Sequence, residues 1–156
     1  GLATAKGLAI GSTLPLIPVP TLEAMAAPFS YHQSVIVPLI RARKEEVYWA
    51  EFSASEGNLV RLSPDSCELL EVMLNKIGHQ KQVLFVGEGA VLFHDQIVKG
   101  FKGNACFPPI GLQSPLASCV AAMGLLRLMK GEARSNEEIV PTYLHILEPK
   151  KQAGKK

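Results

Sequence analysis

The sequence predicts an α/β protein on three observations. Residues 35–52 show a hairpin pattern: an apolar run, a charged turn and a second run rich in aromatic and β-branched residues. The first run does not alternate between apolar and polar residues, so we expect a strand covered on both faces, as in α/β layers. Residues 83–99 show the order strand, glycine turn, helix, and residues 116–130 show the pattern of a long apolar helix.

The composition fits a packed globular chain. Its 156 residues suffice for one domain or two small lobes, and 47% of them are hydrophobic. A net charge of +2 is by itself no argument for nucleic-acid binding. The three cysteines, Cys67, Cys106 and Cys119, lack metal-ligand spacing, which predicts reduced thiols in a cytoplasmic protein. No run approaches the roughly 18 apolar residues of a membrane span, so we expect no membrane partner.

The first elements are a helix, a short strand and a second helix. Residues 1–10 are rich in Ala and Leu, yet no cap residue or strand precedes them, so we expect a fragment that begins at or inside an element. Residues 14–19 predict a strand that two prolines confine to an edge. Thr21 is the expected N-cap of a helix over residues 22–27. Residues 28–34 are the expected connection at a lobe boundary.

Beyond the hairpin the pattern alternates between strands and helices. Residues 55–58 predict a turn, and residues 59–62 predict a returning strand. A Ser-Pro pair then signals a helix over residues 64–77, which Gly78 ends. Residues 83–86 are apolar throughout and predict a buried strand.

The last third is predicted to be mostly helical. A helix over residues 90–99 is closed by Gly100, and a second Ser-Pro pair starts the helix over residues 116–130. That helix is apolar nearly all round, so we expect burial on more than one side. Residues 138–147 are the last piece expected to be ordered. The lysine-rich residues 148–156 predict a disordered tail, more a solubilising terminus than an RNA-contacting arm.

Residue chemistry alone gives no convincing catalytic set. The four histidines lie far apart, and none has a second His within a helical turn, so polar loop histidines are favoured over metal ligands. The pairs Ser66-Cys67 and Ser118-Cys119 lie among apolar residues. Packing explains them better than nucleophilic catalysis does, because a nucleophile needs a neighbouring base.

Two clusters keep a functional alternative open. Gly87-Glu88-Gly89 follows a strand and precedes a helix, which is the context of a phosphate-binding loop. It is shorter than the standard fingerprints and Glu88 would repel an anion, so a tight turn is favoured. Glu45 and Glu46 stand beside three basic residues and could form an acid/base cluster. A solvated hairpin turn with compensating charges is favoured there.

Six short motifs along the chain resemble those of one bacterial protein family. The clearest is Ala42-Arg43-x-x-Glu46-Val47-Tyr48, which is similar to the family's Asp-Ala-Arg-x-x-Glu-Val-Tyr hairpin. The opening GLATAKGLA is similar to the family helix that follows Gly-Ser-Phe-Thr-Gly-Leu-Arg. The others, in family order along nearly the whole chain, are Thr21-Leu22-Glu23-Ala24, Gly87-Glu88-Gly89-Ala90, Pro115-x-Ala117 and Pro141-x-Tyr143-Leu144. Together the six resemble the TsaB/YeaZ family, bacterial proteins of tRNA threonylcarbamoyladenosine biosynthesis.

The chain also departs from the family pattern. Arg41 stands where the family has Asp, which puts any role of that carboxylate in doubt. His145 replaces a terminal Arg, and Pro38 interrupts the first strand of the hairpin. The family's N-terminal strands, with their Asp-Thr-Ser opening, are not in this sequence. What is present resembles the end of an N-terminal lobe followed by a C-terminal lobe.

The resemblance implies an actin-like, ribonuclease-H-like α/β architecture in two lobes. Residues 1–30 correspond to a partial N-terminal lobe, and residues 31–147 to a complete C-terminal lobe. The implied role is that of a non-catalytic scaffold subunit that binds a catalytic TsaD-like subunit, with a TsaE-like ATPase joining the assembly. ATP and metal then belong to the partner subunits, a homodimer is possible, and tRNA is reached only through the complex.

The implied docking surface lies on the first two helices. From the residues alone, the small side chains of residues 1–10 fit core packing and an interface equally well; the resemblance favours an interface. The expected partner-binding residues are Thr4, Ala5, Gly7, Leu8, Thr21 and Leu22. The family-motif residues expected to be structural are Arg43, Glu46, Tyr48, Gly87 and Gly89. The alternatives are a stand-alone glycoprotease-like hydrolase or actin-like ATPase, and an unrelated α/β binding module.

Overall fold

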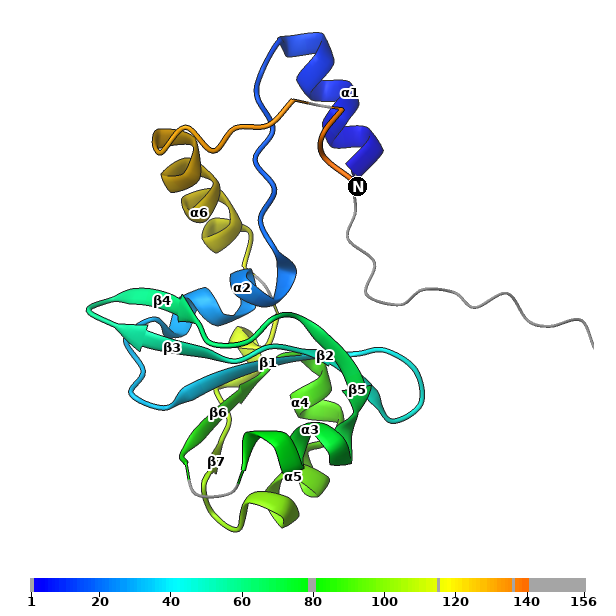
Figure 1. The fold of residues 1–156 in the computed structure, drawn as a ribbon, viewed down its shortest axis with the longest axis vertical. Coiled ribbons are helices and arrows are strands. Elements are labelled where there is room, and N and C mark those ends of the chain that lie inside the picture. Colours follow the sequence, from blue (N-terminus) through cyan, green and yellow to red (C-terminus); the bar gives the residue numbers. More distant parts are fainter. Residues whose placement is uncertain (1, 79–80, 115, 136, 141–156) are drawn as a thin grey trace, which may run out of the picture.

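A mixed sheet with helices on both faces forms the centre of the molecule, which confirms the predicted α/β class (Figure 1). The computed structural model describes residues 2–78, 81–114, 116–135 and 137–140. In chain order the elements are α1 (Leu2–Ser12), α2 (Thr21–Ala26), the 3₁₀ turn η1 (Ala27–Phe29), β1 (Val35–Arg41), β2 (Glu46–Trp49), β3 (Phe52–Ser55), β4 (Asn58–Arg61), β5 (Ser66–Leu69), α3 (Leu70–Ile77), β6 (Val83–Val86), α4 (Glu88–Leu92), α5 (His94–Phe101), β7 (Ala105–Cys106), the 3₁₀ turn η2 (Ile110–Leu112) and α6 (Ala117–Met129).

The predicted hairpin is the middle of this sheet, and both of its faces are covered. On β1, Val37 and Leu39 belong to a core cluster that includes residues of α3, α4 and α5. Ile36, which precedes Val37 and so faces the other side of the sheet, belongs to a second cluster formed with α2. All three side chains are fully buried. This two-sided burial is the physical reason that the run is apolar without alternation.

The second half of the hairpin is one long strand with a bend. β2 and β3 pair antiparallel with β1 in a single register, Leu39 opposite Trp49 and Ile36 opposite Phe52. On its other edge β1 pairs parallel with β6, and β6 pairs parallel with β7. Glu56 and Gly57, both with positive φ, make the two-residue turn that returns β3 into β4. The predicted turn and returning strand are therefore confirmed.

The helix predicted over residues 64–77 is wrong in its first part. Ser66–Leu69 is strand β5, paired with β2, and α3 starts only at Leu70. The Ser-Pro signal fails because the Ser63 hydroxyl accepts a hydrogen bond from the Glu51 amide at 2.8 Å instead of capping a helix. β4 and β5 are thus two parts of one edge strand, separated by a bulge around Ser63 that shifts the register against β2 and β3 by two residues.

The strand at residues 83–86 is confirmed, since every residue of β6 is buried. The helix predicted over residues 90–99 is two helices, α4 and α5, which meet at Phe93. Gly100 does not end the second one: α5 runs to Phe101 and closes at Lys102 in the left-handed conformation. The short strand β7 was not predicted, because two residues carry no period.

Between α1 and α2 the predicted strand does not form. Residues 13–20 run as an extended linker with one isolated antiparallel bridge, between Leu16 and Arg134. The prolines deny this segment a ladder, as expected for an edge position. Thr21 is not the N-cap of α2: Pro20 holds that position and Thr21 is the first helical residue.

The late helix forms as predicted, but its expected burial is wrong. α6 carries no buried side chain, and Met129 and Leu126 are 77% and 59% exposed. Its N-cap is Leu116, without a side-chain capping bond, so Ser114 does not cap it. In Figure 1 α6 stands beside α2, away from the body of the sheet. An apolar pattern cannot distinguish a helix covered by the chain's own core from one that awaits another surface.

The same segment passes a composition test for a membrane span. Residues Ile110–Met129 have a mean hydropathy of 1.3, although only 6% of the segment is buried within the molecule. The continuous helix within it, α6, has 13 residues. At 1.5 Å per residue that helix is about 20 Å long, shorter than the roughly 30 Å of a bilayer core. The span signal is therefore weak.

The remaining expectations concern the cysteines and the C-terminal residues. The cysteines are free thiols, half-buried rather than fully buried, and Cys67 lies on strand β5 rather than on a helix. Most of the piece predicted at residues 138–147, and all of the tail at residues 148–156, lie outside the described residues.

Candidate docking surface

Helix α1 is apolar and almost entirely uncovered. Its one charged residue is Lys6, and its one buried residue is Ala9. Leu8 is 71% and Ile10 67% exposed. In Figure 1, α1 lies at the opposite end of the molecule from α3 and α5, beyond α2. A helix without a polar face gains little stability in water unless something covers it.

The predicted docking residues divide between surface and core. Thr4, Gly7 and Leu8 on α1 are exposed, and Ala5 is half-buried. On α2, Thr21 is exposed, but the two helices do not contribute equally. Leu22 is 3% exposed and packs with Met25 and Ala26 in the cluster beneath β1. Its visible role is to seat α2 on the sheet, so the surface that the structure offers is α1 together with Thr21.

A shared carboxylate fixes α2 to its surroundings. Glu23 Oε1 accepts a hydrogen bond from Arg127 Nη2 on α6 at 2.7 Å, and its Oε2 lies 3.8 Å from Arg61 Nη2 on β4. Arg127 Nη1 also donates to the Pro18 carbonyl of the linker at 2.6 Å. Arg61 in turn lies over the ring of Phe52, 4.6 Å from its centroid. These contacts join α2, α6, the linker and the sheet.

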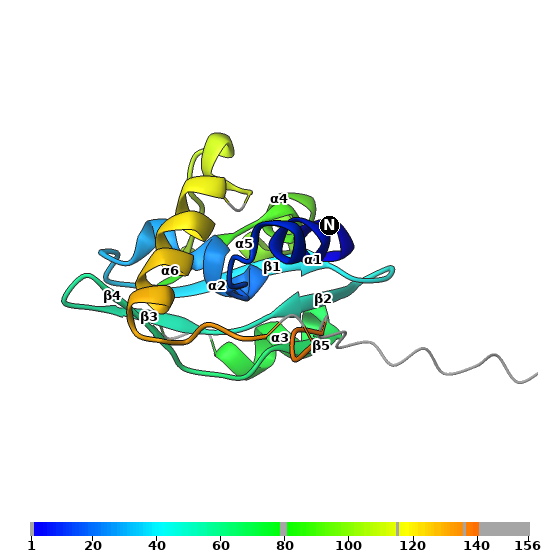
Figure 2. The same ribbon diagram turned by 90° about the horizontal axis from the view of Figure 1, so that it is seen from above.

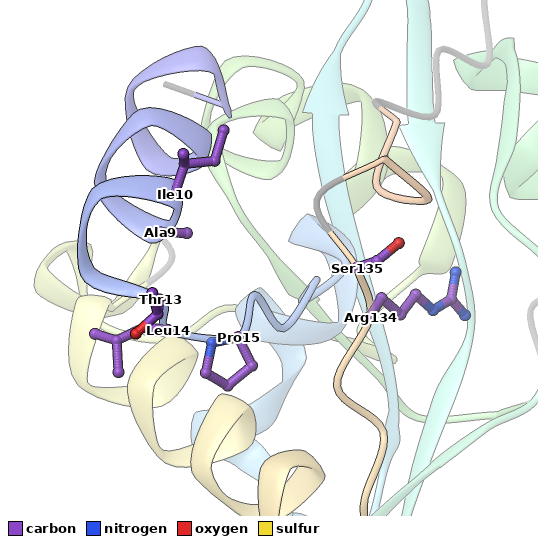
Figure 3. Close-up of a pocket in the computed structure, with 7 residues that line it drawn as sticks. All are labelled: Ala9, Ile10, Thr13, Leu14, Pro15, Arg134 and Ser135. Atoms are coloured by element: carbon purple, nitrogen blue, oxygen red, sulfur yellow. The ribbon is translucent and has the colours of Figure 1, made fainter.

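A hollow of about 410 Å³ separates α1 from the chain that follows α6 (Figure 3). Figure 3 shows α1 and the start of the linker on one side and Arg134 and Ser135 on the other. The one charged side chain that lines it is Arg134, and the lining holds no carboxylate, histidine or cysteine. The residues that line it are Ala9, Ile10, Thr13, Leu14, Pro15, Arg134 and Ser135. We therefore interpret it as the seam behind α1 and not as a catalytic pocket.

The Gly87–Gly89 turn packs closely against α2 and β1. A Cβ on Gly87 would lie 2.2 Å from Met25 Cε and 2.4 Å from the Leu39 carbonyl oxygen. A Cβ on Gly89 would lie 3.0 Å from the same carbonyl. The Gly87 amide, which a phosphate loop would offer to an anion, donates instead to Gln113 Oε1 at 2.8 Å. Of the two interpretations of this motif, the tight turn is the one the geometry favours.

The family-motif residues of the hairpin hold its turn. The Arg43 carbonyl accepts the Glu46 amide at 2.7 Å, and Lys44 between them has φ +46°. Figure 2 shows this turn projecting beyond the helices. Tyr48, half-buried, pairs with Cys67 across the sheet. Burial is the main cause that raises the pKa of the Cys67 thiol, with the Glu46 carboxylate adding to it.

The described histidines do not form a metal cluster. His32 Nδ1 accepts a hydrogen bond from the Ser34 amide in a loop. His94 pairs with Asp95 and lies against the ring of Phe107 in a tilted arrangement. His79 and His145 lie outside the described residues. Within the described ranges no group of three His, Cys, Asp or Glu side chains is placed to hold an ion.

Sequence patterns do not reveal the contacts of three residues that organise this surface, Glu23, Arg127 and Gln113. Glu23 belongs to one of the sequence motifs, but neither Arg127 nor Gln113 stands in a motif that predicts its contacts. Glu23 and Arg127 are 104 residues apart, so periodicity and motif spacing give no signal for their contact. Gln113 is 8% exposed and its Nε2 also donates to the Pro108 carbonyl, a role that only the folded chain reveals.

The chain is similar in sequence to proteins of one known family. The family model described as "TsaD: tRNA N6-adenosine threonylcarbamoyltransferase" matches residues 1–145. The tRNA threonylcarbamoyladenosine biosynthesis protein TsaB of Escherichia coli is 41% identical over 157 residues, covering 92% of this chain and 63% of that protein. TsaB of Bacillus subtilis is 29% identical over 150 residues, covering 95% of this chain and 63% of that protein. The chain thus spans 63% of the length of both relatives.

Solved structures agree in fold. A Pseudomonas aeruginosa protein described as similar to the peptidase YeaZ superimposes with a TM-score of 0.72 at 19% identity, covering 92% of this chain and 65% of that one. YeaZ from Pseudomonas aeruginosa gives a TM-score of 0.70, also at 19% identity. At such identity the likeness concerns the fold. The family match covers most of the chain and, with the two TsaB relatives, shows that this chain belongs to the TsaD family as a member of its TsaB/YeaZ group.

Proposed function

We propose that this chain acts in tRNA threonylcarbamoyladenosine biosynthesis as a non-catalytic subunit, and that α1 docks it onto a catalytic TsaD-like subunit. The observation that carries the proposal is an apolar helix with Leu8 and Ile10 left in solvent. Membership of the TsaB/YeaZ group supplies the process, and the exposed helix supplies the means of joining it. Burying such a surface against another subunit is favourable at roughly 25 cal/mol per Å² of apolar area.

A second observation supports a role without chemistry in this chain. In open α/β sheets ligands bind beyond the carboxyl ends of the strands, at a topological switch point. Here that region, at the ends of β1 and β6, is occupied by the chain's own Met25, Leu39 and Gln113. We therefore propose that ATP and metal are held by partner subunits, a TsaE-like ATPase among them, and that tRNA is reached only through the complex.

The architecture we propose is the actin-like one, with residues 1–30 in a first lobe and residues 31–147 in a second. The sheet supports this: merging the bent strands gives the order β7, β6, β1, β2/β3, β5/β4, with β2/β3 antiparallel to its neighbours. That order fits a ribonuclease-H-like layer. We propose a cytoplasmic location, where tRNA is modified, and leave a homodimer through α1 as the competing use of the same surface.

Reconstitution tests the proposal. The purified TsaD-like and TsaE-like subunits, tRNA, ATP and the threonylcarbamoyl donor are assayed for modified adenosine with and without this chain. Modification that requires the chain, while the chain alone gives none, supports the scaffold role. The proposal would be refuted if modification were unchanged in an assay that contains neither this chain nor a full-length TsaB/YeaZ protein.

The competing enzyme reading has its own measurement. Calorimetry of the isolated chain with ATP-magnesium, and separately with zinc, should give no heat of specific binding. The Gly87 amide that would bind a phosphate already donates to Gln113, and the described residues offer zinc no cluster of ligands. Tight binding of either to this chain alone would favour the stand-alone hydrolase or ATPase instead.

A further inference from the structure

Arg127 makes contacts that its place at the end of α6 does not require. A helix C-terminus gains from a positive charge by itself, with the side chain in solvent. The Arg127 side chain is instead 23% exposed, and its two terminal nitrogens point to separate segments. Nη2 bonds Glu23 on α2 at 2.7 Å, and Nη1 bonds the Pro18 carbonyl at 2.6 Å. Its Nε lies 4.0 Å from Glu132 in the chain after α6.

The segment that Arg127 holds is the linker that carries α1. Residues 13–20 contain three prolines and no ladder. A second contact ties the same linker from the other side: the Arg134 amide donates to the Leu16 carbonyl at 3.2 Å. Two hollows flank the contact between Leu16 and Arg134: the one behind α1 described above, and a second that Pro18 and Glu132 help to line. Side chains therefore do not fill the space between the linker and the chain after α6. Polar contacts, and not a packed core, therefore fix the linker against α6.

We propose that Arg127 is a positioning residue that presets α1 for docking by latching the linker, residues 13–20, to α6 and α2. The planar guanidinium suits this task because its fork bonds a carboxylate and a carbonyl at once, which a lysine ammonium on a single stem does not reproduce. With the latch closed, α1 is presented in one orientation. With it open, α1 samples many, and the docking-competent fraction falls, which weakens apparent affinity in proportion.

Amide exchange on the full chain tests the latch without any partner. The reporter is the Arg134 amide, whose acceptor is the linker carbonyl of Leu16. Arg127→Met should raise its exchange rate about tenfold or more, the effect of losing one hydrogen bond to a charged group. Arg127→Lys should give an intermediate rate, because Lys can keep one contact but not both. The Phe85 amide, in the buried strand β6, should stay at its wild-type rate.

Two variants guard the interpretation. Arg41→Met makes the same chemical change at the end of β1, away from the linker, and should leave the Arg134 amide unchanged. Glu23→Gln keeps the size of the side chain and removes the charge, so it should raise exchange at Arg134 even if Arg127→Met proves insoluble. Arg134 exchange within about twofold of wild type in both Glu23→Gln and Arg127→Lys would overturn the latch.

An affinity measurement then tests whether the latch affects docking, and this measurement rests on the function proposed above. Affinity for the TsaD-like subunit should fall about tenfold in Arg127→Met, with Arg127→Lys between it and wild type. If the wild-type chain does not bind that subunit, the proposed function fails while the exchange result still judges the latch. If wild type binds and Arg127→Met binds equally well although its Arg134 amide exchanges faster, the claim that the latch presets α1 is wrong.

Discussion

Replacing Gly87 by Ala should destabilise the fold strongly, because two independent costs meet at one atom. The backbone of Gly87 has φ +102° and ψ 171°, a region almost restricted to glycine that costs an L-residue about 1–3 kcal/mol. The new Cβ would also lie 2.2 Å from Met25 Cε and 2.4 Å from the Leu39 carbonyl oxygen. Forcing a methyl group into a packed site costs about 1–3 kcal/mol more. We expect a total loss of about 2–6 kcal/mol in the free energy of unfolding.

The assay is urea unfolding followed by the fluorescence of Trp49, which is the single Trp of the chain and is 4% exposed. Gly124→Ala is the matched control: it lies within α6 with nothing within 4 Å of the new Cβ, so it should stabilise by about 0.5–1 kcal/mol. A Gly87→Ala protein whose unfolding midpoint matches wild type would refute the close packing of this turn and reopen the phosphate-loop interpretation.

Three further predictions concern α2 and α1, the bulge at Ser63 and the thiol of Cys67. Leu22→Ala should cost about 2–5 kcal/mol of unfolding free energy because Leu22 is buried, whereas Leu8→Ala should stay within about 0.5 kcal/mol; equal urea midpoints would contradict this division. Ser63→Ala should cost about 1 kcal/mol by leaving the Glu51 amide unpaired, and unchanged stability would argue against the bulge. The pKa of Cys67 is raised above 9.0, so the folded state holds its proton more tightly; stability should fall as pH rises past 9.0, and Cys67→Ala should lose that part of the slope. A Cys67→Ala slope identical to that of wild type would contradict it.

Local pattern was enough for the centre of the fold. The run from Val35 to Ile40 predicted a strand buried on both faces, and the two core clusters on either side of β1 show why. The strand at residues 83–86 and the glycine turn after it followed from the same kind of signal. Glycine is required at position 87 because the backbone there comes close to the Leu39 carbonyl. The sequence predicted the tight turn but not this contact.

The errors came from contacts distant in sequence. Ser63 reads locally as a helix cap, but its hydroxyl serves the Glu51 amide across the sheet. The apolar α6 suggested a core helix, yet none of its described residues is buried. The bond between Glu23 and Arg127 had no local trace at all. What remained unpredicted is therefore the part of the molecule that arranges α1 and α2, where tertiary contacts decide the outcome.

The most direct test of docking through α1 is calorimetric titration of the TsaD-like subunit with Leu8→Glu, compared with Leu92→Glu. Both residues are exposed leucines, 71% and 53%, but Leu92 lies on α4, on the opposite face of the sheet from α2. The account predicts wild-type affinity for Leu92→Glu and a loss of at least a hundredfold for Leu8→Glu, since a charge buried without a partner costs several kcal/mol. Wild-type affinity in the Leu8→Glu protein, with its fold intact by Trp49 fluorescence, would contradict the account.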